Sequence, residues 1–198
     1  MILMTQQVKD FAQVWVESRD VSNTENNPVI KALLERRSCR NFEKTQVKDE
    51  ELDVILKAGE YAASGHGGQS AKMVVIQNPE VIAKLSKWNA QILGVKSDPF
   101  YGAPTIILVL ADASKPTAVE DGSLVLGNLM LAAHALGLAS CWINRAKEEF
   151  ATDEGKALLK QWGLEGDYIG VGHLALGYAA SALPKAAPRK KDFVSIVK

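Results

Sequence analysis

Residues 127–144 read GNLMLAAHALGLASCWIN, and this stretch decides the fold. A helical period starts at Gly122 and runs to Leu136, with apolar side chains on nearly every side from Leu124 onward. Gly137 predicts a left-handed turn that ends this helix, and residues 138–143 predict a strand. A helix that is apolar nearly all round belongs in the middle of a large core or in a dimer interface.

Other strands and helices are expected on both sides of this stretch. Residues 105–110, TIILVL, are an unbroken apolar run, which predicts a strand buried on both faces. Two more strands are expected, at 73–77 and 171–178. The remaining expected helices cover 28–38, 48–63, 79–88 and 152–162. About four strands separated by helices predict an α+β domain with one central sheet.

Charge and composition exclude several classes of protein. The chain has 198 residues, of which 47% are hydrophobic, and 23 Lys and Arg balance 23 Asp and Glu. These values predict a globular chain with no general attraction to nucleic acid or to an anionic membrane. Residues 124–142 approach the length of a membrane span, but polar side chains and glycines interrupt them. The first residues, MILMTQQVKDF, lack the pattern of a secretory signal, so none is expected. Two widely spaced cysteines without CxxC spacing fit a reducing compartment, so a cytoplasmic location is expected.

A cluster of cationic side chains follows the helix that begins at Pro28. Arg36, Arg37, Ser38 and Arg40, here called the arginine cluster, place three guanidinium groups and a hydroxyl within five residues. Guanidinium forks and hydroxyls suit phosphate oxygens, because bidentate charge-assisted bonds are strong and directional. The alternative is a basic last turn that complements the helix dipole.

A second basic group lies in the Pro-rich tail, whose alternative interpretation is a solvated terminus. It comprises Lys185, Arg189, Lys190 and Lys191. The two groups can meet on one phosphate only if the tail packs back or crosses to another subunit.

A glycine-rich loop joins an expected helix to an expected strand. Residues 64–70, SGHGGQS, are here called the glycine loop. Such a loop lets backbone amides approach a flat polar ligand, although an ordinary flexible connection has the same composition. It is neither a GxGxxG fingerprint nor a phosphate-binding P-loop, because it lacks the Lys-Ser/Thr ending and precedes its strand.

Metal, hydrolase and disulfide chemistry find no support in the sequence. His66, His134 and His173 have no metal-binding spacing and no carboxylate partner in the pattern, so the last two are interpreted as satisfied core residues. No serine lies in a GxSxG elbow. Cys39 and Cys141 are far apart without CxxC spacing, so we expect them to stay reduced.

Taken together, six segments resemble the FMN-dependent nitroreductase family. They are ALLERRSCRNF (32–42), AGEYAASGHGGQS (58–70), YGAPTIILVLAD (101–112), the stretch 127–144, HLALGY (173–178) and APRK (187–190). The resemblance covers residues 27–198 and leaves residues 1–26 as a separate arm, expected to be helical over 5–20. It implies an α/β sandwich with a mostly antiparallel sheet between helices, in an entwined homodimer that holds FMN at its interface.

The resemblance also implies a role for each site residue. Arg36, Arg37, Ser38 and Arg40 would hold the FMN phosphate, ribityl chain and pyrimidine edge, with Arg189 and Lys190 completing the phosphate site. Ala63, Ser64, Gly65 and Gln69 would lie beside the flavin ring. Trp142, Ile143 and Asn144 would pass its other side, where a backbone amide usually faces N5. No side chain is expected to act as a catalytic acid or base, and no metal is expected.

The glycine loop departs from the family pattern. Where the family usually has Asn-x-Gln-Pro-Trp, this chain has Gly67-Gly68-Gln69-Ser70-Ala71, so a contact to the ring edge is missing. The departure implies a more open pocket, with His66 and Tyr101 as candidate substrate-binding residues.

The function implied by the resemblance is an NAD(P)H oxidoreductase. It would reduce a nitroaromatic, a quinone or a similar flat small-molecule acceptor by a ping-pong mechanism. Two alternatives remain open at this point. One is a flavin carrier or redox sensor with little turnover, and the other keeps the fold but catalyses dehydrogenation or reductive removal of a substituent.

Overall fold

A computed structural model describes residues 26–198, so the helical arm expected over 5–20 lies outside the described residues. The chain divides into two units, residues 1–35 and 36–198. The described part of the first unit is helix α2, Pro28–Glu35, which begins where Asn27 Oδ1 accepts hydrogen bonds from the amides of Val29 and Ile30. The proposed boundary between residues 26 and 27 stays a prediction.

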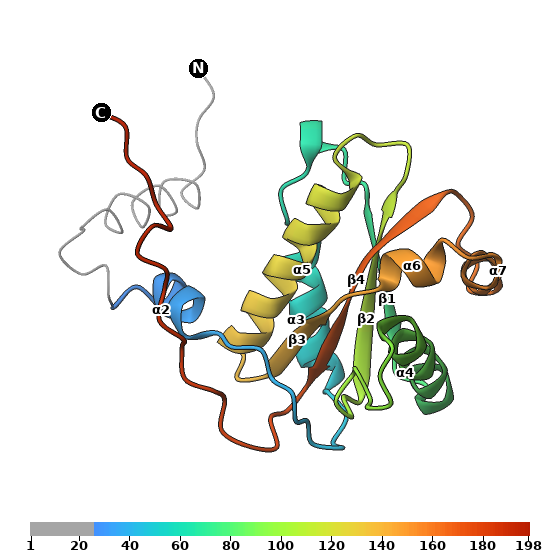
Figure 1. Ribbon diagram of the computed structural model, residues 1–198, viewed down its shortest axis with the longest axis horizontal. Coiled ribbons are helices and arrows are strands. Elements are labelled where there is room, and N and C mark those ends of the chain that lie inside the picture. Colours follow the sequence, from blue (N-terminus) through green and yellow to red (C-terminus); the bar gives the residue numbers. More distant parts are fainter. Residues whose placement is uncertain (1–25) are drawn as a thin grey trace, which may run out of the picture. The chain divides into compact units, whose positions relative to one another are not determined.

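The second unit is built on a four-stranded sheet (Figure 1). Its strands are β1 Ala71–Ile76, β2 Thr105–Asp112, β3 Ala139–Ile143 and β4 Tyr168–Gly177. Their order is β1-β2-β4-β3 and every neighbouring pair is antiparallel, which confirms the expected central antiparallel sheet. The strands β1 and β3 therefore form the two edges.

Helices cover both faces of the sheet, and each face has its own core. Helices α3, Asp49–Glu60, and α5, Ala118–Ala135, pack on one face. Three other helices pack on the opposite face: α4 Pro79–Leu93, α6 Ala146–Phe150 and α7 Asp153–Gln161. The sequence pattern did not predict α6.

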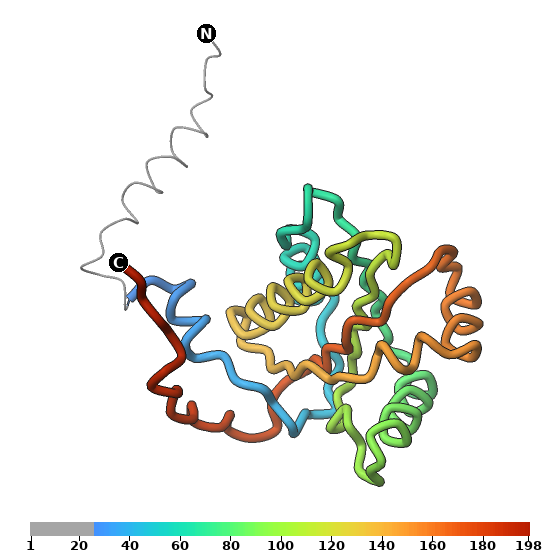
Figure 2. The backbone as a smooth tube through the Cα atoms, turned by 45° about the horizontal axis from the view of Figure 1, so that its top comes forward, coloured from blue at the N-terminus to red at the C-terminus, as the bar shows by residue number. Residues whose placement is uncertain are grey.

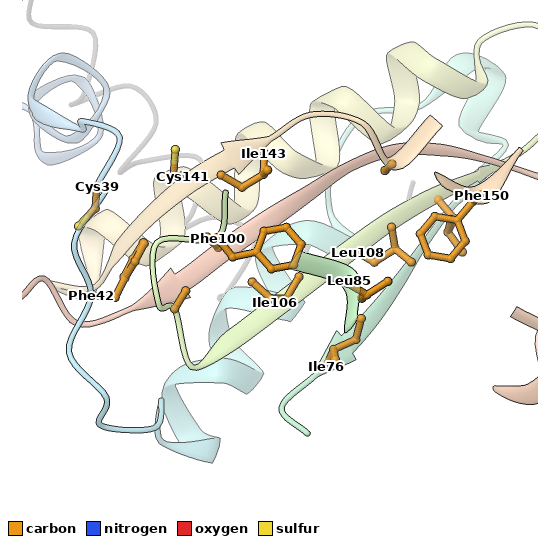
Figure 3. Packing of buried hydrophobic residues seen from close by; sticks show 14 of the residues in the cluster. Cys39, Phe42, Ile76, Leu85, Phe100, Ile106, Leu108, Cys141, Ile143 and Phe150 are labelled. Atoms are coloured by element: carbon orange, nitrogen blue, oxygen red, sulfur yellow. The ribbon is translucent and has the colours of Figure 1, made fainter. Parts of the chain in front are cut away.

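Strand β2 separates these two cores, as its apolar run predicts. Its residues from Thr105 to Ala111 are buried. Ile106 and Leu108 point into the core shown in Figure 3, whereas Ile107 and Val109 point toward α3 and α5. A central strand with side chains buried on both faces needs no polar alternation.

Helix α5 ends as expected but is not buried on every side. Gly137 has φ 80°, and the amide of Leu138 donates to the carbonyl of Ala133 in a Schellman turn. Leu126 and Leu129 are fully buried, but Leu124 is 49% exposed and Leu136 41% exposed. Within the described residues, Leu124 on α5 and Leu136 at its C-cap are therefore left partly uncovered. No helix of the described residues is long and apolar enough to cross a membrane.

Candidate functional site

The arginine cluster lies against the outer edge of β3. Ser38 forms a parallel bridge with Ser140, and the amide of Cys39 donates to the carbonyl of Ser140 at 2.9 Å. The buried Cys39 fixes this segment to the core, so the side chains beside it are held at the start of β3. Nη1 of Arg36 is buried and has no hydrogen-bond partner within residues 26–198. A buried donor without an acceptor is costly, which makes this nitrogen a candidate ligand for an anion.

The electrostatics of Cys141 show how near the cluster lies to β3. Burial raises the pKa of the Cys141 thiol, while the positive charge of Arg40 and a hydrogen bond with Ser38 oppose this shift. Because burial dominates, the thiol stays protonated at neutral pH and is a poor nucleophile.

The glycine loop is tied to the first turn of α5 by Asp121. The carboxylate Oδ1 of Asp121 accepts from the amide of Gly65 at 2.8 Å, and its Oδ2 accepts from the hydroxyl of Ser70 at 2.6 Å. The bonds from Ser70, Gly65 and Thr117 lower the pKa of Asp121 despite its burial. Asp121 was not predicted as a site residue, because an acidic side chain in a first helical turn is already explained by the helix dipole.

The same loop holds two non-glycine residues in the left-handed region. His66 has φ 52° and Gln69 has φ 46°, and the amide of Gln69 donates to Ser64 Oγ at 3.0 Å. A Cβ on Gly65 would lie 2.3 Å from Thr117 Oγ1, so only glycine fits there. Non-glycine residues adopt this conformation at a cost and persist where the surroundings impose it. The loop is therefore a hydrogen-bonded structure rather than a loose connection.

The end of β3 presents the third part of the site. Trp142 packs over β4 at Gly172, where a Cβ would lie 2.4 Å from the indole Nε1. Ile143 is buried, whereas Asn144 is exposed and its carbonyl accepts from Asn89 Nδ2 at 2.8 Å. Arg145 follows with φ 84°.

The sequence predicts His134 and His173 as core residues and identifies no carboxylate partner for either. His173 is fully buried, as expected, whereas His134 is only half-buried. His173 does have a carboxylate partner, because its Nε2 lies 3.0 Å from Glu149 Oε2 and both side chains are fully buried. Glu149 is on α6, the helix that the sequence pattern missed. Among residues 26–198, no group of His, Cys, Asp and Glu side chains is arranged to hold a metal ion.

The structure brings the predicted residues together in two groups rather than one. The arginine cluster and Trp142–Asn144 share β3, which follows the C-terminal end of α5. The glycine loop is fixed at Asp121, near the opposite end of that helix (Figure 1). Asp121 and Ala135 are about 21 Å apart along the axis at a rise of about 1.5 Å per residue.

The two candidate substrate residues are separated as well. His66 is exposed in the glycine loop, whereas Tyr101 packs against the core on the opposite face of the sheet. Arg189 and Lys190 are exposed in the tail that follows β4 (Figure 2), and the Arg189 guanidinium donates to the carbonyl of Ala187 at 2.9 Å.

Cavities border some of the predicted site residues and not others. The cavity beside Ala63, Ser64 and Gln69 measures about 150 Å³. Ligand pockets usually enclose roughly 300–1,000 Å³. A larger groove of about 940 Å³ lies between α4 and residues 95–104, and no residue predicted to bind FMN lines it. A third cavity, of about 340 Å³, is lined by Gln69, Ser70 and Ala71. Among the described residues, neither the arginine cluster nor Trp142–Asn144 lines any of these three cavities.

The protein is an α+β sandwich. Its antiparallel sheet has the order β1-β2-β4-β3, and the arginine cluster lies against the edge strand β3. The chain belongs to the nitroreductase family, because the sequence model of that family matches residues 33–94 and 88–178. The family resemblance expected from the sequence is thus confirmed.

Three relatives are 29–31% identical to this chain over the aligned residues. A crystal structure of a nitroreductase with bound FMN from Bacteroides fragilis is 29% identical, with a TM-score of 0.79, and the match covers 87% of this chain and 100% of that one. A protein of Archaeoglobus fulgidus, provisionally named NADH dehydrogenase/NAD(P)H nitroreductase, is 29% identical over 75% of this chain and 84% of its own length. A protein of the same provisional name from Methanothermobacter thermautotrophicus is 31% identical, and the match spans 58% of this chain and 59% of that relative.

Proposed function

We propose that this protein is a cytoplasmic FMN-dependent oxidoreductase that takes a hydride from NAD(P)H and reduces a nitroaromatic, a quinone or a similar flat acceptor by a ping-pong mechanism. The observation that carries the proposal is the buried, unpartnered Nη1 of Arg36 beside Ser38 and Arg40 at the edge of β3. This donor set fits a phosphate and the polar chain next to it.

The residues present fit FMN in the following way. Arg36, Arg37 and Ser38 would bind the phosphate and ribityl oxygens, and Arg40 would lie at the pyrimidine edge. The exposed Arg189 and Lys190 would reach the phosphate from the tail. Ala63, Ser64, Gly65 and Gln69 would line one side of the ring, and Trp142, Ile143 and Asn144 the other.

FMN, when bound, supplies the hydride and electron chemistry of both half-reactions. The protein's contribution is to bind, orient and exclude water. A positive charge from Arg40 and a backbone donor beside the ring favour an anionic reduced cofactor. His66 and Tyr101 remain the residues we propose to contact nicotinamide and acceptor; because one chain separates them, they would do so from different copies of the chain. No side chain need transfer a proton.

We propose further that the site is completed by a second copy of the chain. On the face of α5 that carries Leu124, Gly127 and Leu131, the first two residues are exposed and Leu131 is half-buried in the described residues, and a Cβ on Gly127 would meet nothing within 4 Å. If two α5 helices pack antiparallel about a twofold axis, the glycine loop of one chain comes beside the arginine cluster of the other. Residues 27–198 would then form the FMN-binding domain of a homodimer, with residues 1–26 as a separate arm.

The test uses the purified full-length protein. A visible spectrum with flavin bands, FMN released on denaturation, and anaerobic bleaching by NADH or NADPH are the expected results. Turnover with a panel of nitroaromatics and quinones then identifies the acceptor class. A yellow protein that neither nucleotide bleaches would instead support the flavin carrier or sensor, and a protein that binds no FMN would contradict the proposal.

A further inference from the structure

Three buried polar side chains lie in contact with one another inside a core that otherwise consists of aromatic and aliphatic side chains. Asn89 on α4, Glu149 on α6 and His173 on β4 are 1%, 0% and 0% exposed. The rings of Phe100 and Phe150 lie within 5.2 and 6.2 Å of the His173 ring, measured between centroids. A carboxylate in such surroundings is costly unless polar partners surround it, so its contacts are informative.

The contacts of these three side chains lead from the core to the backbone at the end of β3. His173 Nε2 lies 3.0 Å from Glu149 Oε2. Asn89 Nδ2 donates to Glu149 Oε1 at 2.9 Å and to the carbonyl of Asn144 at 2.8 Å. Both donor hydrogens of Asn89 are therefore used, one to hold Glu149 and the other to hold an exposed piece of backbone.

The bond to Asn144 fixes the direction of the next amide. No peptide bond in the described residues is cis, so the N–H of Arg145 points opposite to the Asn144 carbonyl. That carbonyl points inward to Asn89, and the Arg145 N–H consequently points away from the core. It makes no hydrogen bond within residues 26–198. The left-handed φ of 84° at Arg145 shows that this turn is imposed by its surroundings.

We propose that Asn89, Glu149 and His173 are positioning residues that hold the Arg145 backbone N–H as a fixed donor toward the ring edge of FMN. This inference rests on the proposed function and names the residues that orient the ring-facing backbone. Asn89 makes the direct contact, while Glu149 and His173 keep the Asn89 amide in the required orientation. Neither the three side chains nor Arg145 were predicted as site residues.

The experiment compares Asn89→Leu with Gln77→Leu in the full-length protein. Gln77 is the control, because its side-chain Nε2 also donates a hydrogen bond, to Thr105 Oγ1 at 3.3 Å, and it follows β1, the sheet edge opposite to β3. Each variant is measured for thermal unfolding without flavin, for the dissociation constant of FMN, and for the flavin midpoint potential.

Asn89→Leu is expected to weaken FMN binding about five- to tenfold, the effect of one hydrogen bond, and to make the midpoint potential more negative. Gln77→Leu should lower thermal stability, leave the FMN dissociation constant within about twofold of wild type and leave the midpoint potential unchanged. Glu149→Gln keeps an acceptor for Asn89 and should retain most of the wild-type affinity, whereas Glu149→Leu should behave like Asn89→Leu.

Equal flavin affinities and potentials in Asn89→Leu and Gln77→Leu would overturn the proposal and leave a purely structural role. If Asn89→Leu does not fold, Asn89→Ser replaces it, since the short hydroxyl cannot span from Glu149 to the Asn144 carbonyl. A wild-type protein that binds no FMN would overturn the proposed function and this inference together, and is distinguished by the wild-type titration alone.

Discussion

Replacing Arg36 by alanine should weaken FMN binding by about 10- to 100-fold. Nη1 of Arg36 is already buried without a partner in the described residues, so its bond to a phosphate would replace no existing protein bond. A charge-assisted hydrogen bond of this kind contributes about 1.5–3 kcal/mol, and a tenfold change corresponds to about 1.4 kcal/mol. Arg36→Lys keeps the charge but loses the planar fork, so it should give an intermediate affinity.

The assay is a titration of apoprotein with FMN, in which the quenching of flavin fluorescence measures binding. Lys57→Ala is the control, because it removes one positive charge from an exposed pair with Glu60 on α3. Arg189→Ala should weaken FMN to a similar extent as Arg36→Ala but should hardly affect riboflavin, which lacks the phosphate. Arg40→Ala should mainly lower the flavin reduction potential. If Arg36→Ala binds FMN as tightly as Lys57→Ala, or if Arg189→Ala weakens riboflavin as much as FMN, the shared phosphate site is wrong.

Four further outcomes are expected. Asp121→Asn should lower the free energy of unfolding at pH 6. Because folding lowers the pKa of Asp121, the extra stability of the wild type should be full above about pH 4 and should disappear as the pH falls through the lowered pKa. Urea denaturation of both proteins at pH 6 and pH 3 measures this difference. Replacing Cys39 and Cys141 together by alanine should change turnover by less than about tenfold with FMN bound, and a larger loss would show a catalytic thiol. Leu124→Lys should reduce dimer formation and FMN binding together in sedimentation and flavin titrations, whereas an unaltered dimer would place the interface elsewhere. Deleting residues 1–26 should leave a folded, yellow protein, and loss of flavin from such a truncation would make the arm part of the site.

The strands and long helices could be predicted because their patterns are local. The run 105–110 identifies a strand buried on both faces, and Gly137 marks the end of α5, since each signal lies within a few residues. Helix α6 escaped prediction because five residues are too few to show a helical period. The all-round apolar pattern of α5 predicted either a large core or a dimer interface, but the pattern alone could not say which side of the helix stays exposed.

The sequence allowed us to predict the hydrogen-bond donors of the candidate site but not the side chains that hold those donors in place. Guanidinium groups and glycines carry their chemistry in the sequence, so the arginine cluster and the glycine loop could be named. Asp121 and Asn89 act through partners more than 50 residues away. No spacing rule connects such residues, and only folding brings them together.

The bridge between Ser38 and Ser140 has a practical consequence for engineering this protein. Strand β3 lies at the edge of the sheet, and an uncovered edge can recruit strands from other molecules into aggregates. The segment that carries the proposed phosphate ligands therefore also shields β3. A library that alters cofactor preference should vary Arg36, Arg37 and Arg40 while leaving the buried Cys39 and Phe42 in place, because loosening those two anchors would trade altered selectivity for poor solubility.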